Sequence, residues 1–406
     1  EISTRDWSSD VCSSDLVFGM NIVFVRANLH DSTQAIPRAV EACSSIFQQI
    51  HVLCWNRRGL PGAPSSANRF TITQFNRSVR TRSIQAIAMM FVYQCWVIVH
   101  LWRLRPDVVQ VLDFESAVPA AVCRLFLRFK LIYDMRDPFA ESYHFPSVIA
   151  TCAYTLDWIV MACSSAFVLP GENRRRYLGR WGSTKPVAVV LNTCNDELTS
   201  IPTKSLWAPR RERDVRIAFL GYLVPSRGAH MLLSVCAEDS HLILGIAGTF
   251  GSIQLKNKVE HIARVSYFGQ LGRADALALM RDADAVALLY DPSVNKEGYP
   301  NKLYESLSVG TPIIVSQGIG IDDLIQKEHL GLLVEYANQN SLINALKRLS
   351  DQHFLNETRS RCRAFFLKNC GLEQELLKYR NFYTDICIGS HNGNRSQGIN
   401  CHNTLD

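Results

Sequence analysis

The sequence predicts an α/β protein of two domains, each built on a doubly wound parallel sheet. Short apolar strands alternate with helical stretches along most of the chain, and such repeated units connect parallel strands through right-handed crossovers. A polar segment with two prolines, residues 196–214, interrupts the alternation and marks a domain boundary. The chain has 406 residues and is 47% hydrophobic, which is enough apolar material for two cores.

The first domain is expected over residues 17–195. Its first strand, 21–26 (NIVFVR), is followed by a helix expected over 33–49, and residues 57–68 form a loop rich in Gly, Pro and Ser. β-Branched and aromatic runs predict the other strands of this sheet. They are expected at 51–55, 70–75, 107–112, 130–134, 166–169 and 187–191.

The second domain is expected over residues 215–371, after a linker at 196–214. Two late helices are expected at 341–350 and 354–369, and a last helix at 372–387 follows the domain. The strands of this domain are predicted by short apolar runs. They are expected at 215–221, 242–247, 265–268, 285–290, 313–316 and 332–335.

Neither end of the chain is expected to belong to the fold. Residues 1–16 have no Met, basic region or apolar region of a signal peptide, and they resemble a translated sequencing-adapter fragment of the kind fused to environmental gene fragments. We therefore expect a non-native leader there. The tail, 388–406, is polar and is expected to be disordered.

Charge and cysteine content exclude two classes of protein. The net charge is only +6, and no basic module with interleaved aromatic residues is present, so a nucleic-acid partner is not expected. The thirteen cysteines are scattered without a C-x-x-C pair, which indicates free thiols in a reducing compartment and not a disulfide framework. These observations predict a cytoplasmic protein.

Residues 84–102 form the longest apolar stretch, with arginines on both sides. Nineteen residues, of which only Gln85, Gln94 and His100 are polar, are long enough to span a membrane, but a span would separate strands that should share one sheet. A buried core helix is the second interpretation. A helix lying on the surface of an anionic membrane is the third, and the basic flanks favour it.

The most informative stretch is 295–316, NKEGYPNKLYESLSVGTPIIVS, which predicts a loop, a helix, a turn and a buried strand. Pro300 suits the first helical turn, and Gly310 suits the helix end. The start of a helix leaves unpaired N–H groups and carries partial positive charge, so it attracts phosphate. The expected donors belong to residues near Asn301, Lys302, Leu303 and Tyr304.

Two carboxylates flank this expected anion site. Glu297 precedes the helix, and Glu305 lies one turn inside it on the same face as Asn301. An ionised carboxylate can accept two hydroxyl hydrogen bonds, so the pair suits a nucleotide-diphospho-sugar, with ribose on one side and hexose on the other. The alternative is a surface helix on which Lys302 and Glu305 form a solvated i,i+3 pair.

The stretch resembles the signature of retaining glycosyltransferase family four, whose GT-B fold has two such domains facing across a cleft. That family carries two glutamates separated by seven residues at the donor site, as Glu297 and Glu305 are here. The resemblance implies that Glu297 approaches the hydroxyls of the donor sugar and that Glu305 holds the ribose. It also implies donor contacts from the segment between them, at Gly298, Tyr299, Pro300, Asn301, Lys302 and Leu303.

The resemblance extends to VRIAFLGYLVPSRG, where the family has a glycine at the strand end and two cations on the donor phosphates. Gly221 is that glycine, Tyr222 replaces the first cation, and Arg227 stands at the second. A guanidinium binds phosphate bidentately, so Arg227 is a sound substitute, with a surface turn arginine as the alternative. Phe268 lies in a segment that resembles the one whose backbone holds the base.

The first domain contributes weaker candidates. In LIYDMRDPFAES, Arg136 precedes Asp137 where family members often carry His before Asp. Arginine cannot act as an acid or base at neutral pH, but it can stabilise a departing diphosphate. The alternative is an ion pair of Arg136 with Asp137 or Glu141 that fixes the loop. Asn28 and His30, after the first strand, are candidates for the acceptor side.

No metal and no organic cofactor are expected. Asp282 and Asp284 form a D-x-D pair, but they end a helix and precede a strand, whereas a metal-holding pair follows a strand. A cap or turn is therefore their expected role. No Gly-x-Gly-x-x-Gly follows any expected strand, so a nicotinamide site is not expected.

The resemblance implies a reaction that moves a hexose-type sugar from a nucleotide-diphospho-sugar to a glycan or lipid-linked acceptor, with retention and without metal. Glu297, Arg227 and Arg136 are its expected catalytic residues. The implied setting is cell-surface polysaccharide or lipopolysaccharide synthesis, in the cytoplasm or peripherally on the inner face of the cell membrane. A nucleotide-sugar epimerase and a non-catalytic sugar-binding module on the same fold remain alternatives, because a fold does not fix a function.

Overall fold

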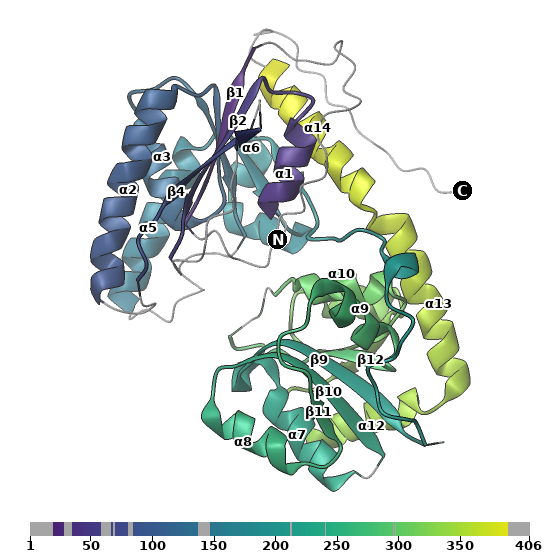
Figure 1. The fold of residues 1–406 in the computed structure, drawn as a ribbon. Helices are drawn as coiled ribbons and strands as arrows, with labels where there is room; N and C mark the ends of the chain where they lie inside the picture. The colour runs from purple at the N-terminus through teal and green to yellow at the C-terminus, as the bar shows by residue number, and fades with distance from the viewer. Residues whose placement is uncertain are drawn as a thin grey trace. The chain divides into compact units, whose positions relative to one another are not determined.

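The computed structural model describes residues 19–27, 35–57, 66–67, 70–79, 84–136, 147–211, 213–239, 241–294, 296 and 298–388. The chain forms two compact units (Figure 1). The first unit contains the chain up to Val190 and again from Leu376 onward, and the second contains Leu191–Glu375. The expected leader, 1–16, and the tail beyond residue 388 lie outside the described residues.

The first unit is built on one eight-stranded sheet with the order β3-β4-β2-β1-β5-β6-β7-β8. Every pairing in it is parallel except that of β3 with β4. The strand order runs outward in both directions from β1 and β5, so the sheet is doubly wound as the sequence predicts. The strands are β1 (Asn21–Arg26), β2 (Gln49–Trp55), β3 (Ser66–Ala67), β4 (Phe70–Phe75), β5 (Val108–Val111), β6 (Lys130–Asp134), β7 (Ala166–Leu169) and β8 (Val187–Val189).

Helices cover both faces of this sheet (Figure 1). On one face α2 (Ile84–Leu104), α3 (Phe114–Arg124) and α5 (Ser147–Cys163) share a core with the strands. On the other face α1 (Ala35–Cys43) lies beside α14 (Leu372–Ile388). The ring of Phe47, which follows α1, meets the ring of Tyr383 on α14 edge to face, with 5.9 Å between the two centroids. The short helices η1 (Glu172–Leu178) and α6 (Trp181–Thr184) connect β7 to β8.

The helix expected over 33–49 is shorter than predicted. Helix α1 ends at Cys43, whose carbonyl accepts from the N–H groups of both Ile46 and Phe47. The N–H of Gln48 then donates to the Met20 carbonyl, which carries the chain into β2. The apolar residues at 46 and 47 therefore pack at a turn, and their helical spacing was misleading.

The last helix, α14, belongs to both units. Its first residues, up to Glu375, are part of the second unit, and the rest is part of the first. In the first unit Tyr383 donates to Oε1 of Gln110 on β5 at 2.5 Å, and Lys130 on β6 bonds the carbonyl of Ile386. These contacts anchor α14 to the first sheet.

The second unit is built on a six-stranded sheet in which every pairing is parallel, with the order β11-β10-β9-β12-β13-β14. Its strands are β9 (Val215–Leu223), β10 (Leu242–Phe250), β11 (Val265–Tyr267), β12 (Ala285–Leu288), β13 (Ile313–Ser316) and β14 (Gly331–Val334). Its helices are η2 (Leu198–Ser200), η3 (Pro225–Arg227), α7 (Ala229–Glu238), α8 (Ile253–His261), α9 (Arg273–Arg281), α10 (Asn301–Ser308), α11 (Asp322–Lys327), α12 (Gln339–Leu349) and α13 (Gln352–Asn369).

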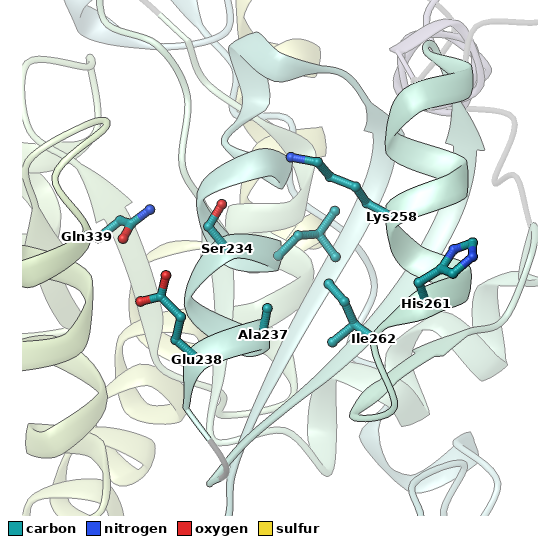
Figure 2. Close-up of a pocket in the computed structure, with 8 residues that line it drawn as sticks. Ser234, Ala237, Glu238, Lys258, His261, Ile262 and Gln339 are labelled. Carbon is teal, nitrogen blue, oxygen red and sulfur yellow. The ribbon is translucent and has the colours of Figure 1, made fainter.

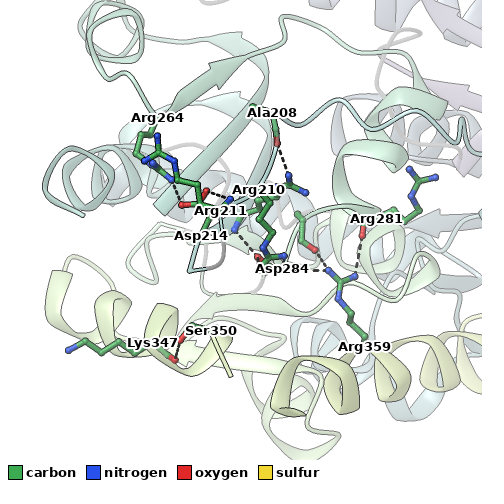
Figure 3. Close-up of polar contacts among 12 residues, drawn as sticks. Ala208, Arg210, Arg211, Asp214, Arg264, Arg281, Asp284, Lys347, Ser350 and Arg359 are labelled. Carbon is green, nitrogen blue, oxygen red and sulfur yellow. Dashed lines mark hydrogen bonds and ion pairs between the residues drawn. The ribbon is translucent and has the colours of Figure 1, made fainter. Parts of the chain in front are cut away.

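The segment 196–214, expected to be a linker, is packed into the second unit. Trp207 is buried in the core of this unit, and its indole N–H donates to the Leu279 carbonyl at 3.0 Å. Arg210 forms an ion pair with the buried carboxylate of Asp284 at 3.0 Å (Figure 3). The segment is polar because it runs over the surface, yet side-chain anchors fix it to the sheet.

Helix α2 buries one face and exposes the other. Tyr93, Val97 and Leu101 are fully buried against the first sheet, whereas Ile87 and Phe91 are 63% and 64% exposed. Among the described residues, α2 is the one helix that is long and apolar enough to cross a membrane. In its most apolar stretch of 18 residues, only 17% is buried. The interpretation as a buried core helix therefore accounts for one face alone.

Candidate functional site

The order of the second sheet indicates where a ligand would bind. From β9 the chain proceeds outward through β10 and β11, and from β12 it proceeds the other way through β13 and β14. The reversal lies between β9 and β12. In open α/β sheets ligands bind at the carboxyl ends of the strands that flank such a reversal. The loops after β9 and β12 are therefore the expected walls of the site.

These two loops are packed tightly against each other. The N–H of Asp291 donates to the Ser226 carbonyl at 2.8 Å. Gly228 has a φ of 73°, and a Cβ added there would lie 2.4 Å from the Cβ of Leu289. Only glycine permits both the left-handed conformation and this close approach. The position of Arg227, immediately before Gly228, is thereby fixed.

Arg227 supplies a positive charge at this site. In the part of the chain that the structure describes, no carboxylate forms an ion pair with it. Its guanidinium lies 5.5 Å from the centroid of the Tyr290 ring, and a Cβ added to Gly221 would lie 3.4 Å from its Nη1. Burial raises the pKa of Tyr290, and the charge of Arg227 lowers it in part. A guanidinium that no carboxylate of the described residues neutralises, next to a glycine that leaves room for a ligand, can bind phosphate.

Helix α10 begins where the sequence predicts. Pro300 occupies the N-cap position, and no side chain caps the first turn. Leu303, Tyr304 and Leu307 are buried and hold the helix in the core. The N–H of Leu303 donates to the Pro300 carbonyl at 3.0 Å, so Leu303 does not offer the free donor that we expected. A tight first turn consumed that N–H group.

Glu305 is held by two cations. Its Oε2 lies 2.5 Å from Nζ of Lys302, and its Oε1 lies 3.8 Å from Nη1 of Arg273. Arg273 also bonds Glu197 through its Nε at 2.9 Å, which raises the pKa of Arg273 against the effect of its burial. The pair of Lys302 and Glu305 that the alternative interpretation expected is thus present. It is mostly buried, and Arg273 and Glu197 extend it into a network of four residues.

The remaining donor candidates are placed in part. Tyr299 is partly buried and packs against the core of the second unit, and burial raises its pKa. Phe268 packs against the same core, and its N–H donates to the Ile246 carbonyl at 2.8 Å. Gly298 is partly exposed. Glu297 lies outside the described residues, so its approach to a donor sugar stays a prediction.

Arg136 has a partner that the sequence analysis did not consider. Its Nη2 donates to Oδ2 of Asp134 at 2.8 Å and lies 3.3 Å from the hydroxyl of Tyr379, and its Nε lies 2.7 Å from Oδ1 of Asp134. Asp134 is fully buried. The charge of Arg136 is therefore already neutralised by a buried carboxylate. This pairing argues against a role of Arg136 in stabilising a departing diphosphate. Asp137 and Glu141, the partners expected for Arg136, lie outside the described residues.

The first sheet has its own reversal, between β1 and β5. Asn28 and His30 follow β1 there but lie outside the described residues. Asp113 follows β5 and joins the two strand ends, because its Oδ2 accepts from the N–H of Ala27 at 2.8 Å and its Oδ1 from that of Ser116 at 2.9 Å. Burial, and then the charge of Asp113, raise the pKa of the neighbouring Glu115 to about 7.

Sequence reasoning missed Glu115, Arg273 and Glu197. Glu115 follows a strand at its carboxyl end, as Arg136 does, so the same positional argument applied to every strand would have found it. Arg273 and Glu197 are 76 residues apart, and Arg273 is 32 residues from Glu305, so no local pattern marks them.

Asp282 and Asp284 lie at the end of α9 and before β12, as expected. Asp282 is bound by Arg281 at 2.6 Å, and buried Asp284 accepts from Arg210 at 3.0 Å and from the N–H of Arg216 at 2.8 Å (Figure 3). Both carboxylates already have cationic partners. Within the described residues no cluster of three or more His, Cys, Asp or Glu side chains could hold a metal ion.

A separate pocket of about 340 Å³ opens between α7 and α8 (Figure 2). Ser234, Glu238, Lys258 and His261 line it, with Gln339 of α12 at its edge. None of the candidate donor residues belongs to its lining. It lies between helices and not at the ends of β9 and β12, so we do not assign the ligand to it.

Two curated relatives and one family match this chain in part. Residues 207–365 match the model of the family described as Glycosyl transferases group 1. UDP-Gal:alpha-D-GlcNAc-diphosphoundecaprenol alpha-1,3-galactosyltransferase of Escherichia coli is 33% identical over 92 residues, which are 23% of this chain and 24% of the relative. Phosphatidyl-myo-inositol mannosyltransferase of Mycobacterium leprae (strain TN) is 30% identical over 173 residues, which are 40% of this chain and 43% of the relative. The matched region thus spans less than half of either relative.

The fold is similar to that of solved structures over nearly the whole chain. Sucrose-phosphate synthase from Thermosynechococcus elongatus superposes with a TM-score of 0.71 at 16% identity, covering 90% of this chain and 99% of the other. At that identity the likeness concerns the fold alone. It confirms the predicted GT-B fold of two doubly wound parallel sheets.

Proposed function

We propose that the protein is a glycosyltransferase that uses a nucleotide-diphospho-sugar as donor, because residues 207–365 match the model of the family described as Glycosyl transferases group 1. One observation carries the proposal. Arg227, which has no carboxylate partner among the described residues, follows the carboxyl end of β9 beside the reversal of the sheet, within the matched segment. Anionic ligands with a diphosphate fit such a site.

In the proposed reaction the bond between the donor sugar and the diphosphate breaks, and the diphosphate leaves with its negative charge. Arg227 and the uncapped N-terminal turn of α10 stabilise that charge, since both supply positive potential that is in place before the bond breaks. Glu305 accepts hydrogen bonds from the ribose hydroxyls. The mostly buried pair with Lys302 holds its carboxylate in place.

We propose further that the reaction retains the anomeric configuration and needs no metal ion. The resemblance to family four supports retention. The arginine partners of Asp282 and Asp284 support a structural role for the pair that would otherwise be the natural metal ligand. Arg227 and α10 supply charge stabilisation that a metal would otherwise supply.

We propose a glycan or lipid-linked acceptor, in cell-surface polysaccharide or lipopolysaccharide synthesis. The name of the Escherichia coli relative describes transfer to a sugar on diphosphoundecaprenol, a lipid carrier, and this supports a lipid-linked acceptor here. The scattered cysteines support a cytoplasmic location. Peripheral contact with the inner face of the cell membrane is consistent with the exposed apolar face of α2.

The test is a transfer assay with UDP-galactose and UDP-glucose and a diphospholipid-linked N-acetylglucosamine acceptor, with EDTA present. We expect a new glycosidic bond in the same anomeric configuration as the donor, detected by NMR of the product. Conversion of the donor without acceptor would instead indicate an epimerase. Binding without any turnover would indicate a non-catalytic module, and activity only with magnesium or manganese would contradict the metal-free mechanism.

A further inference from the structure

Three neighbouring helices of the first unit each expose large apolar side chains. Helices α2, α3 and α5 cover one face of the first sheet and share its core (Figure 1). On the solvent side, half or more of several of their side chains is exposed, with Leu125 at 71% and Phe126 at 69%. The exposed set, on the three helices and on the turn after α3 that holds Leu125 and Phe126, is Ile87, Phe91, Val92, Val99, Trp102, Val122, Leu125, Phe126, Tyr154, Leu156, Trp158 and Ile159. We call it the apolar helical face.

The apolar helical face is much larger than isolated exposure would explain. On α2 the exposed residues Ile87, Phe91 and Val99 recur at multiples of four, so they form one stripe along the helix. The opposite stripe, with Tyr93 and Val97, is buried in the core. Single exposed apolar residues are ordinary, but a contiguous apolar patch indicates an interaction site.

The charges at this face are mostly positive, and the exposed Asp107, whose Oδ2 accepts from the N–H of Asn21, is the exception near the end of α2. The helical segments 84–104, 114–124 and 147–163 contain only two acidic residues, Glu115 and Asp157, and Asp157 is buried. At the C-terminal ends of α2 and α3, Arg103 and Arg128 are exposed. The face is therefore apolar with a positive rim.

Aromatic rings and arginines gather at the same ends of these helices. The rings of Trp102 on α2 and Phe126 after α3 lie 6.5 Å apart, and the guanidinium of Arg105 lies 4.8 Å from the Trp102 centroid. On α5 the ring of Trp158 contacts that of Trp181 at 5.9 Å. Tryptophan and arginine together suit the headgroup level of a bilayer, where one part of the side chain is apolar and the other is polar.

We propose that the apolar helical face is a docking surface for a lipid bilayer with anionic headgroups. The apolar side chains enter the boundary between headgroups and acyl chains, and the arginines at the helix ends contact the lipid phosphates. This inference extends the location proposed above from one helix to a composite surface of three. It does not depend on the donor site or on turnover, so it can fail independently of the proposed function.

Charge complementarity favours a bilayer over a second copy of the chain. Two copies meeting through this face would bring their arginine rims together, with the exposed Asp107 as one carboxylate against Arg103, Arg105 and Arg128. An anionic leaflet supplies the missing negative charge over an extended plane and accepts apolar side chains without shape complementarity. A membrane span by α2 alone would remove Tyr93 and Val97 from the core that they share with the sheet.

The test is flotation of the full chain with vesicles of phosphatidylcholine alone or of phosphatidylcholine mixed with phosphatidylglycerol. Phe91→Ser, Phe126→Ser and Ile159→Ser remove one exposed apolar side chain each, from α2, from the turn after α3 and from α5. Because each such side chain is already partly buried in the protein and enters the bilayer only in part, we expect each variant to reduce the partition coefficient by about three- to tenfold. Binding should rise with phosphatidylglycerol and fall with salt, and R103Q together with R128Q should remove most of that dependence.

The matched control is Ile253→Ser on α8 of the second unit, since Ile253 is 62% exposed and lies outside the apolar helical face. It should bind vesicles as the wild type does. Loss of binding only for Phe91→Ser would reduce the surface to α2 and contradict the three-helix assignment. Failure of the wild type to float at low salt would overturn the proposal. So would a dimer, seen by sedimentation without vesicles, that the same serine variants dissociate.

Discussion

At the scale of single residues, Arg227 is the side chain on which the proposed chemistry depends most. It lies between the ring of Tyr290 and Gly228, a position where only glycine fits the backbone conformation and the close approach of Leu289. Arg227→Ala should lower turnover by on the order of a hundredfold or more, because one preorganised charge-stabilising group is lost. Steady-state transfer rates measure this, with Arg227→Lys as the comparison. Lysine keeps the charge but not the bidentate geometry, so its loss should be smaller.

Glu305 permits a prediction that separates ribose recognition from phosphate recognition. In Glu305→Ala the ribose hydroxyls lose their acceptor, while Lys302 and Arg273 lose a neutralising carboxylate. Calorimetric titration should show nucleoside diphosphate binding weakened by about ten- to a hundredfold, and pyrophosphate binding unchanged or tighter. Equal weakening for both ligands would place Glu305 away from the ribose.

Glu115 should make the stability of the first unit depend on pH. Its pKa is raised from 4.5 to about 7 in the folded chain, so folding disfavours its ionised form. The wild type should therefore lose stability, relative to Glu115→Gln, as pH rises from about 5 to about 8. Urea unfolding at several pH values measures the difference. The exposed Glu357→Gln variant is the control, and a constant difference between wild type and Glu115→Gln would contradict the raised pKa.

At the scale of elements, the sequence predicted the structure correctly where residues such as Pro and Gly mark the start or end of a helix. Helix α10 follows from Pro300 at its start, Gly310 after its end and buried leucines at helical spacing. The strands follow from β-branched runs. The end of α1 and the packing of 196–214 were mispredicted because both depend on contacts with distant segments, such as the bond from Gln48 to Met20.

Trp207 shows how such a distant contact matters. Its ring packs so closely on β10 that a Cβ added to Gly245 would lie 2.7 Å from Cη2. Trp207→Ala should destabilise the second unit by about 3–5 kcal/mol through the cavity that it leaves. Denaturant unfolding measures this. Trp207→Phe keeps most of the volume and loses the bond to Leu279, so its cost should be about 1 kcal/mol. A near-neutral alanine variant would mean that 196–214 contributes little to the core.

At the scale of the whole molecule, the sequence predicted the fold class, because two doubly wound sheets follow from strand–helix alternation. It did not predict which charges are already paired. Arg136 and Arg227 look alike in the sequence, yet Arg136 is bound to buried Asp134 and Arg227 has no carboxylate partner among the described residues. Partners brought together by folding decide such cases, and periodicity does not reveal them.

The central claim is that the ends of β9 and β12, and not the pocket between α7 and α8, bind the diphosphate of a nucleotide-sugar. Calorimetric binding of UDP-, GDP-, ADP- and dTDP-sugars tests it most directly, on the wild type, Arg227→Ala and the pocket variant Lys258→Ala. We predict that the wild type binds at least one of these donors, that Arg227→Ala weakens the binding by tenfold or more, as loss of about 1.5–3 kcal/mol from a charged hydrogen bond implies, and that Lys258→Ala leaves it unchanged. Unaltered binding in Arg227→Ala, or weakened binding in Lys258→Ala, would contradict the account.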